Sequence, residues 1–153
     1  MAHREAISNE ELAMFLDGGS FYWAISSNVG YSCRNRLEDV QLVQFFLNCI
    51  FDGKRKDGFP SRKNLVVDGK FGGKTWSAIK WFQEDFLCVA DGMVSAAGGK
   101  DNYTPKHGKA YTIHWLNSSY SYYHRQYYKD IRMHPGLPTE LCSQLSGPLP
   151  DLV

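Results

Sequence analysis

Apolar residues recur every three to four positions in several stretches of the chain, which is the pattern of amphipathic α-helices. The first long stretch covers residues 35–51, with Asn35 as its predicted N-cap. One apolar stripe of this helix consists of Val40, Val43, Leu47, Ile50 and Phe51. A second stripe, on the opposite face, consists of Leu42, Phe45 and Cys49. A helix with two apolar faces should be buried on both, so we expect an N-terminal arm or a C-terminal tail to cover the second stripe.

Two further helices follow. Residues 73–86 carry one core stripe, composed of Thr75, Ala78, Ile79, Phe82 and Phe86. Residues 110–131 form a longer apolar-periodic stretch, with the polar residues 117–119 as a candidate break. Pro135 and Pro138 end that stretch, and residues 137–145 are a candidate for a last short helix.

The remaining segments are predicted to be an arm and loops. Ser8 and Glu11 have capping-box spacing and predict a short helix over residues 9–17, followed by a strand or extended arm over residues 21–25. Residues 52–64 are rich in turn-forming and basic residues, and residues 95–109 are small and polar. Both are predicted to be exposed loops.

Composition narrows the possible classes of protein. The 153 residues are 43% hydrophobic with a net charge of +1, which fits one folded domain and gives no reason to expect nucleic acid as a partner. Residues 54–109 nevertheless hold eleven basic and six acidic side chains. We expect no signal peptide and no membrane insertion, because no apolar run is long enough. The four cysteines are widely spaced, so we expect reduced thiols.

One motif is specific enough to indicate a family. Residues 66–83 read V-V-D-G-K-F-G-G-K-T-W-S-A-I-K-W-F-Q, residues 39–48 read D-V-Q-L-V-Q-F-F-L-N, and residues 90–94 (A-D-G-M-V) loosely echo residues 67–71 (V-D-G-K-F). Over residues 38–94 the chain resembles the bacterial peptidoglycan-binding domain family. It departs from that family after residue 94, where the usual start of the third helix is replaced.

The resemblance implies an all-α fold, a peptidoglycan-binding-like three-helix bundle with an N-terminal arm and a C-terminal extension. We divide the chain into an arm (residues 1–34), the peptidoglycan-binding-like domain (residues 35–131) and a tail (residues 132–153). The implied function is non-catalytic binding of peptidoglycan as a targeting or accessory module, with no cofactor. The implied partners are peptidoglycan and a separate wall hydrolase or another protein.

The candidate ligand site lies at the start of the second helix. Gly72 and Gly73 expose backbone amides there, and Lys70 and Lys74 add positive charge, an arrangement that can bind a carboxylate of a stem peptide. Trp81 lies off the core stripe, so it either stacks on a sugar, fills a pocket of a partner protein or packs beneath residues 95–109. Trp76 and Gln83, which flank the stripe on its other side, form a second candidate surface. The needs of the fold are the favoured explanation of Gly72 and Gln83.

The sequence contains no pattern typical of an enzyme. There is no H-E-x-x-H, no G-x-S-x-G and no phosphate-binding loop. Two other functions stay open: a protein–protein adaptor of a phage or secretion system that reuses the fold, and a small muralytic enzyme. In each case the protein would be made without a signal peptide and would act at the cell envelope or in a phage or secreted particle.

Overall fold

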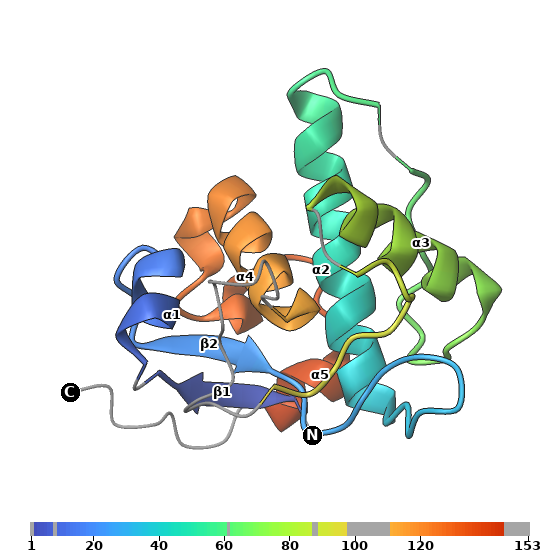
Figure 1. Ribbon diagram of the computed structural model, residues 1–153, viewed down its shortest axis with the longest axis horizontal. Helices are drawn as coiled ribbons and strands as arrows, with labels where there is room; N and C mark the ends of the chain where they lie inside the picture. Colours follow the sequence, from blue (N-terminus) through green and yellow to red (C-terminus); the bar gives the residue numbers. More distant parts are fainter. Residues whose placement is uncertain (1, 8, 61, 87–88, 98–110, 146–153) are drawn as a thin grey trace.

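The computed structural model describes residues 2–7, 9–60, 62–86, 89–97 and 111–145. Figure 1 shows the order of the elements. Two strands and a short helix come first: β1 (His3–Ala6), α1 (Glu10–Phe15) and β2 (Phe21–Ala24). The long helix α2 (Leu37–Lys56) and helix α3 (Gly73–Asp85) form the middle of the chain. The last elements are α4 (Thr112–Tyr123), the single 3-10 turns η2 (Arg125–Tyr127) and η3 (Ile131–Met133), and α5 (Thr139–Gln144).

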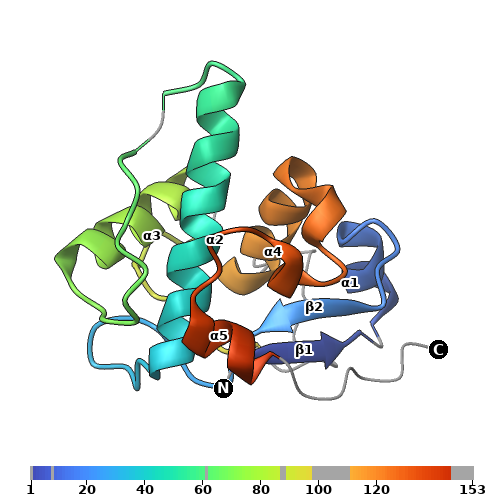
Figure 2. The same ribbon diagram turned by 180° about the vertical axis from the view of Figure 1, so that it is seen from behind.

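Helix α2 occupies the centre of the molecule. Helix α3 lies on one side of it, and α4, α1 and the two strands lie on the other (Figures 1 and 2). Helices α3, α4 and α5 all contact α2. The predicted helices over residues 9–17, 73–86 and 137–145 are therefore present as α1, α3 and α5, with small differences at their ends.

The all-α prediction is only partly right, because β1 and β2 form a small antiparallel sheet. His3 pairs with Ala24 and Ala6 with Phe21. Strand β2 was predicted as a strand or extended arm, and its four residues are all buried. Strand β1 was not predicted, because its residues are mostly polar and do not alternate with apolar ones. It packs nonetheless, because the guanidinium of Arg4 lies 4.7 Å from the ring centroid of Phe21.

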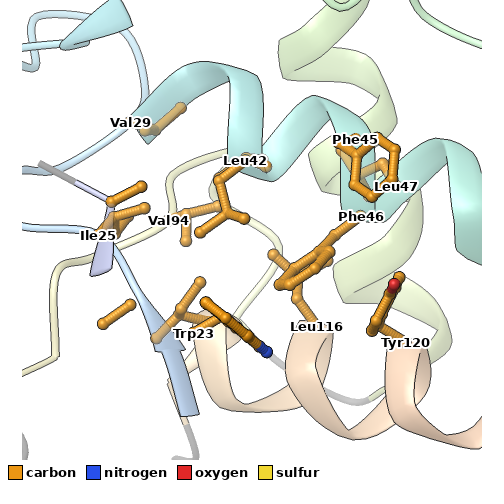
Figure 3. Close-up of a cluster of buried hydrophobic side chains, with 14 of the residues drawn as sticks. Trp23, Ile25, Val29, Leu42, Phe45, Phe46, Leu47, Val94, Leu116 and Tyr120 are labelled. Atoms are coloured by element: carbon orange, nitrogen blue, oxygen red, sulfur yellow. The ribbon is translucent and has the colours of Figure 1, made fainter. Parts of the chain in front are cut away.

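One hydrophobic core joins the N-terminal, central and C-terminal segments (Figure 3). Trp23 and Val29 meet Leu42 and Phe46 of α2, and the ring of Tyr120 stacks on Phe46 with centroids 4.6 Å apart. Within the described part of the chain, no helix is both long and apolar enough to span a membrane.

The prediction that α2 is buried on two sides is confirmed. On its second face, Phe45 packs edge-on against His134, with ring centroids 5.1 Å apart. The Cys49 carbonyl lies 2.9 Å from Nε2 of His124. Helix α5 also contacts α2. The C-terminal part of the chain therefore covers the second apolar stripe.

Helix α2 is longer than predicted. The turn-forming and basic composition of residues 52–64 predicts a loop, but the helix continues through residues 52–56 to Lys56. The ring of Tyr123 lies directly against the Cα of Gly53, where a methyl group would overlap it. The glycine thus serves close packing between α2 and α4 rather than a turn. Residues 57–60 and 62–64 are exposed, as predicted for the loop.

The predicted helix over residues 110–131 is shorter than expected and is not broken at residues 117–119. Helix α4 ends at Tyr123 and is followed by η2 and η3. Asn117 lies inside the helix because its side-chain amide pairs with β2: its Oδ1 accepts from Trp23 N at 2.8 Å and its Nδ2 donates to Trp23 O at 2.9 Å. Of the predicted loop over residues 95–109, residues 98–109 lie outside the described residues.

Both predicted helix caps need correction. The N-cap of α1 is Asn9, whose Oδ1 accepts from Glu11 N at 2.9 Å, while Ser8 lies outside the described residues. The residue before α2 is Arg36, which makes no side-chain capping bond. Asn35 instead adopts a φ of 49° and holds the preceding loop, accepting from Gly30 N at 2.9 Å.

Candidate functional site

A buried glutamine on α2 fixes the turn that leads into α3. The side chain of Gln44 is 1% exposed, and its Oε1 accepts from Gly69 N at 3.0 Å. Its Nε2 lies 3.1 Å from Thr75 Oγ1, 3.2 Å from Lys70 O and 3.3 Å from Asp68 Oδ1. One amide thus holds the Asp-Gly turn and the first turn of α3 against α2.

A second glutamine, on α3, does the same for the next turn. Gln83 is 1% exposed, and its Oε1 accepts from Gly92 N at 2.9 Å. Its Nε2 lies 2.9 Å from Met93 O, 3.0 Å from Thr112 Oγ1 and 3.1 Å from Asp91 Oδ1. The loose sequence echo between the two Asp-Gly turns therefore corresponds to a repeated arrangement in three dimensions.

The glycines of both turns are required by conformation and by space. Gly69 and Gly92 each have a φ of +74°, a backbone conformation that residues with a side chain rarely adopt. A methyl group on Gly69 would overlap Leu37, and one on Gly92 would overlap the indole of Trp76. The two turns are thus packed tightly as well as hydrogen-bonded.

A cleft of about 800 Å³ lies between residues 62–66 and the start of α3. Polar side chains of α2 hold its outer wall in place. Asn48 pairs with the Leu65 backbone, accepting from its N at 2.7 Å and donating to its O at 2.9 Å. Two turns further along α2, Arg55 donates to Arg62 O at 2.7 Å and to Asn64 Oδ1 at 2.6 Å. Asn48 and Arg55, seven positions apart on one face of α2, therefore hold the wall.

The cleft carries an excess of positive charge. Its lining includes four basic side chains, those of Arg62, Lys63, Lys70 and Lys74, and one carboxylate, that of Asp68. All five of these residues are exposed. The backbone amide of Lys70, 2.9 Å from the carboxylate, and the amide of Gln44 hold the pKa of Asp68 below its ordinary value. That carboxylate is thus ionised at neutral pH, and its Oδ1 already accepts hydrogen bonds from Lys70 N and Gln44 Nε2.

The start of α3 forms the floor of the cleft, with Gly72 and Gly73 among its lining residues. Gly72 is the N-cap, and no side chain caps the helix. The first turn of α3 contains no acidic residue, whereas those of α1 and α2 contain two each. This helix start keeps the partial positive charge of its backbone amides available to an anion.

Four of the seven predicted site residues line this cleft: Lys70, Gly72, Gly73 and Lys74. The other three, Trp76, Trp81 and Gln83, do not line it. The amide of Gln83 is enclosed in the second turn, as described above. Trp76 packs against Tyr31, with ring centroids 5.8 Å apart, and the ammonium of Lys80 lies 4.8 Å from its ring.

Trp81 packs on the C-terminal end of α2. Its ring is half-buried and meets Phe51 edge-on, with centroids 5.3 Å apart. The ammonium of Lys54 lies 5.1 Å from the centroid, and Lys54 also pairs with Asp85 of α3. The guanidinium of Arg62 lies 5.9 Å away and donates to Ser77 Oγ at 2.8 Å. Arg62 therefore links the cleft wall to α3 beside this tryptophan.

The sequence reasoning missed the outer wall of the cleft. Arg62, Lys63 and Asn64 were assigned to an exposed basic loop with no site role. One feature of the sequence could have indicated this wall. Two amide side chains, those of Gln44 and Asn48, lie four residues apart and thus share one face of α2. Within the part of the chain that the structure describes, no group of three or more His, Cys, Asp or Glu side chains could hold a metal ion.

Comparison with known proteins identifies the segment that contains the cleft. Residues 36–97 match the family model described as a putative peptidoglycan binding domain. No curated protein and no solved structure matches the chain. The match confirms the resemblance seen in the sequence. It includes all the lining residues of the cleft and both Asp-Gly turns.

Proposed function

We propose that this chain, whose residues 36–97 match the model of a putative peptidoglycan binding domain, binds bacterial cell-wall peptidoglycan in the basic cleft at the start of α3. The observation that carries the proposal is the placement of Lys70 and Lys74 beside the uncapped glycine start of that helix, within the matched segment. Stem peptides of peptidoglycan carry carboxylates. Such a group would accept from the helix amides and lie close to the ammonium groups.

The chemistry of this cleft suits binding. Among the residues that the structure describes, its lining contains no histidine, cysteine or glutamate and one carboxylate, that of Asp68, which is held by the Lys70 amide and Gln44. A pair of carboxylates that could cleave a glycan is thus not present among the described lining residues. We infer that the protein acts as a non-catalytic targeting or accessory module for a wall-acting system, with a separate wall hydrolase as a candidate partner. Its place of action would be the cell envelope or a phage or secreted particle.

The alternative function is a protein–protein adaptor that reuses the fold, and the two apolar faces of α2 together with the changed start of the third helix favour it in the sequence. That argument loses its basis, since Phe45 and Cys49 on the second face are covered by His134, His124 and α5. The structure also provides a third helix after residue 97, in the form of α4.

Cosedimentation with purified peptidoglycan sacculi, together with a zymogram on the same material, tests the proposal. We expect the protein to sediment with sacculi and to produce no clearing in the zymogram. Failure to sediment would contradict the proposal and favour the adaptor function. Clearing of the embedded sacculi would show a muralytic enzyme instead.

A further inference from the structure

Tyr31 is a large aromatic residue that a hydrogen-bonded loop keeps at the surface. Its side chain is 60% exposed. The loop around it is bound on both sides: Val29 pairs with Val94 through two backbone hydrogen bonds of 2.9 and 2.8 Å. After the tyrosine, the Asn35 amide accepts from Gly30 N at 2.9 Å and donates to Gly30 O at 2.8 Å. An exposed aromatic ring on a loop fixed in this way is preorganised for contact with a ligand.

The ring of Tyr31 belongs to an aromatic ledge, which we define as Tyr31, Phe71 and Trp76. Tyr31 meets Phe71 edge-on, with centroids 5.1 Å apart and planes at 88°. It lies at 46° to Trp76, with centroids 5.8 Å apart. Phe71 and Trp76 contact part of the tyrosine ring, and its 60% exposure leaves the rest of the side chain open to solvent.

The aromatic ledge borders the basic cleft at Gly73. The Tyr31 hydroxyl lies 3.8 Å from the position that a Cβ on Gly73 would take, and Gly73 lines the cleft. A ligand bound at the start of α3 would therefore lie next to the tyrosine hydroxyl. Tyr31 precedes the matched residues 36–97, so the ledge includes a residue that the family model does not cover.

We propose that Tyr31 stacks on a sugar ring of the glycan strand while the cleft holds a carboxylate of the attached stem peptide. The preferred ligand is then the junction between glycan and peptide, rather than the peptide alone. A pyranose ring offers an apolar C–H face that fits an aromatic surface, and an exposed apolar patch beside a polar cleft is typical of a binding site with both kinds of contact. This inference rests on the proposed function.

The test compares two soluble probes from the same sacculi: the disaccharide stem peptide released by a muramidase, and the sugar-free stem peptide released by an amidase. We expect the parent protein to bind the disaccharide peptide more tightly than the free peptide. Tyr31→Ala should weaken binding of the disaccharide peptide by about tenfold and leave binding of the free peptide unchanged. Tyr31→Phe, which keeps the ring, should bind like the parent. Tyr122→Ala, at a 77% exposed tyrosine that does not line the cleft, is the matched control.

Other outcomes distinguish this inference from the proposed function. If the parent binds both probes equally, or if Tyr31→Ala binds the disaccharide peptide like the parent, the ledge has no role and the cleft alone explains binding. If Tyr31→Ala weakens both probes equally while circular dichroism shows an intact fold, the sugar contact is likewise refuted. If the parent binds neither probe, the inference and the proposed function both fail.

Discussion

Gln44 and Gln83 make equivalent hydrogen bonds in two successive turns of the chain. Each accepts from the glycine of an Asp-Gly turn and donates to a threonine in the first turn of the next helix. The first glutamine lies 25 residues before its glycine and the second lies 9 residues before its own. Because the intervening lengths differ, the sequence shows no strict repeat although the geometry is repeated. The first of these units forms part of the cleft, and the second anchors α4.

The buried amide of Gln83 should be important for stability. Gln83→Leu leaves Gly92 N and Thr112 Oγ1 without the partner they have in the parent, so we expect a loss of about 2–4 kcal/mol in the free energy of unfolding. Urea denaturation followed by tryptophan fluorescence measures this loss. The matched control is Gln126→Leu, at an exposed position, which should change stability by less than about 0.5 kcal/mol. Equal effects of the two substitutions would refute the structural role of Gln83.

Replacement of Gly53 by alanine should destabilise the protein, contrary to the usual effect. Gly→Ala inside a helix normally stabilises by about 0.5–1 kcal/mol. Here the added methyl would overlap the Tyr123 ring, so we expect a net loss of about 1–3 kcal/mol. Chemical denaturation of the variant, and of Gly53→Ala combined with Tyr123→Ala, measures the effect. In the Tyr123→Ala background, Gly53→Ala should become neutral or stabilising. A destabilisation that persists there would mean that Tyr123 is not the cause.

Stability should fall between neutral pH and pH 4 because of a buried histidine. His114 is 0% exposed, and burial lowers its pKa from 6.5 to about 4. The unfolded chain therefore takes up a proton on His114 below about pH 6.5, while the folded protein resists protonation until about pH 4. The free energy of unfolding should accordingly decrease over this window, by at most about 1.4 kcal/mol for each pH unit.

Urea denaturation at pH 7.5, 6 and 5 measures that slope. The non-titrating variant His114→Gln should show a shallower slope over the same range. His134, whose pKa burial also lowers to about 4, should leave a residual slope in the variant. If His114→Gln retained the full slope of the parent, His114 would not be the group responsible.

Cys49 should be unreactive in the folded protein. Its side chain is 6% exposed, and burial, with a smaller contribution from Asp52, raises the pKa of its thiol to about 12. Because the thiolate is the reactive species, iodoacetamide should label Cys49 only after denaturation. Cys33 is half-buried and serves as the internal control, with faster labelling expected in the native state. Peptide mass spectrometry that finds equal native rates for the two cysteines would contradict the buried position of Cys49.

Local patterns predicted much of the fold. Apolar periodicity predicted helix α3 and the burial of α2 on two sides. The motif around the glycines at the start of α3 indicated the candidate site. The elements that were missed depend on contacts between distant residues. Strand β1 is polar and is defined by its pairing with β2, while Gly53 stays helical because Tyr123 packs against it.

The wall of the cleft was missed for the same reason. Leu65 is placed by an amide on α2, 17 residues earlier in the chain, and no local pattern in residues 62–66 reveals this contact. Conversely, Trp81 was predicted as a candidate site residue because it is aromatic and lies off the core stripe of its helix. It packs against Phe51, which its own helix could not indicate.

The charge of Lys74 provides the most direct test of the binding site. Lys74→Glu reverses one charge at the floor of the cleft. The new carboxylate would lie in the first turn of α3, where a negative charge interacts favourably with the helix dipole. The fold should therefore remain intact. Lys129→Glu makes the same change of net charge at an exposed position that does not line the cleft, and is the matched control.

The decisive measurement is cosedimentation of the parent, Lys74→Glu and Lys129→Glu with purified sacculi at low and at high salt. If the basic cleft binds the wall, Lys74→Glu should lose most of its binding, Lys129→Glu should bind like the parent, and binding of the parent should decrease as salt rises. Equal sedimentation of all three proteins, with folding verified by circular dichroism, would contradict the assignment of the cleft as the peptidoglycan site.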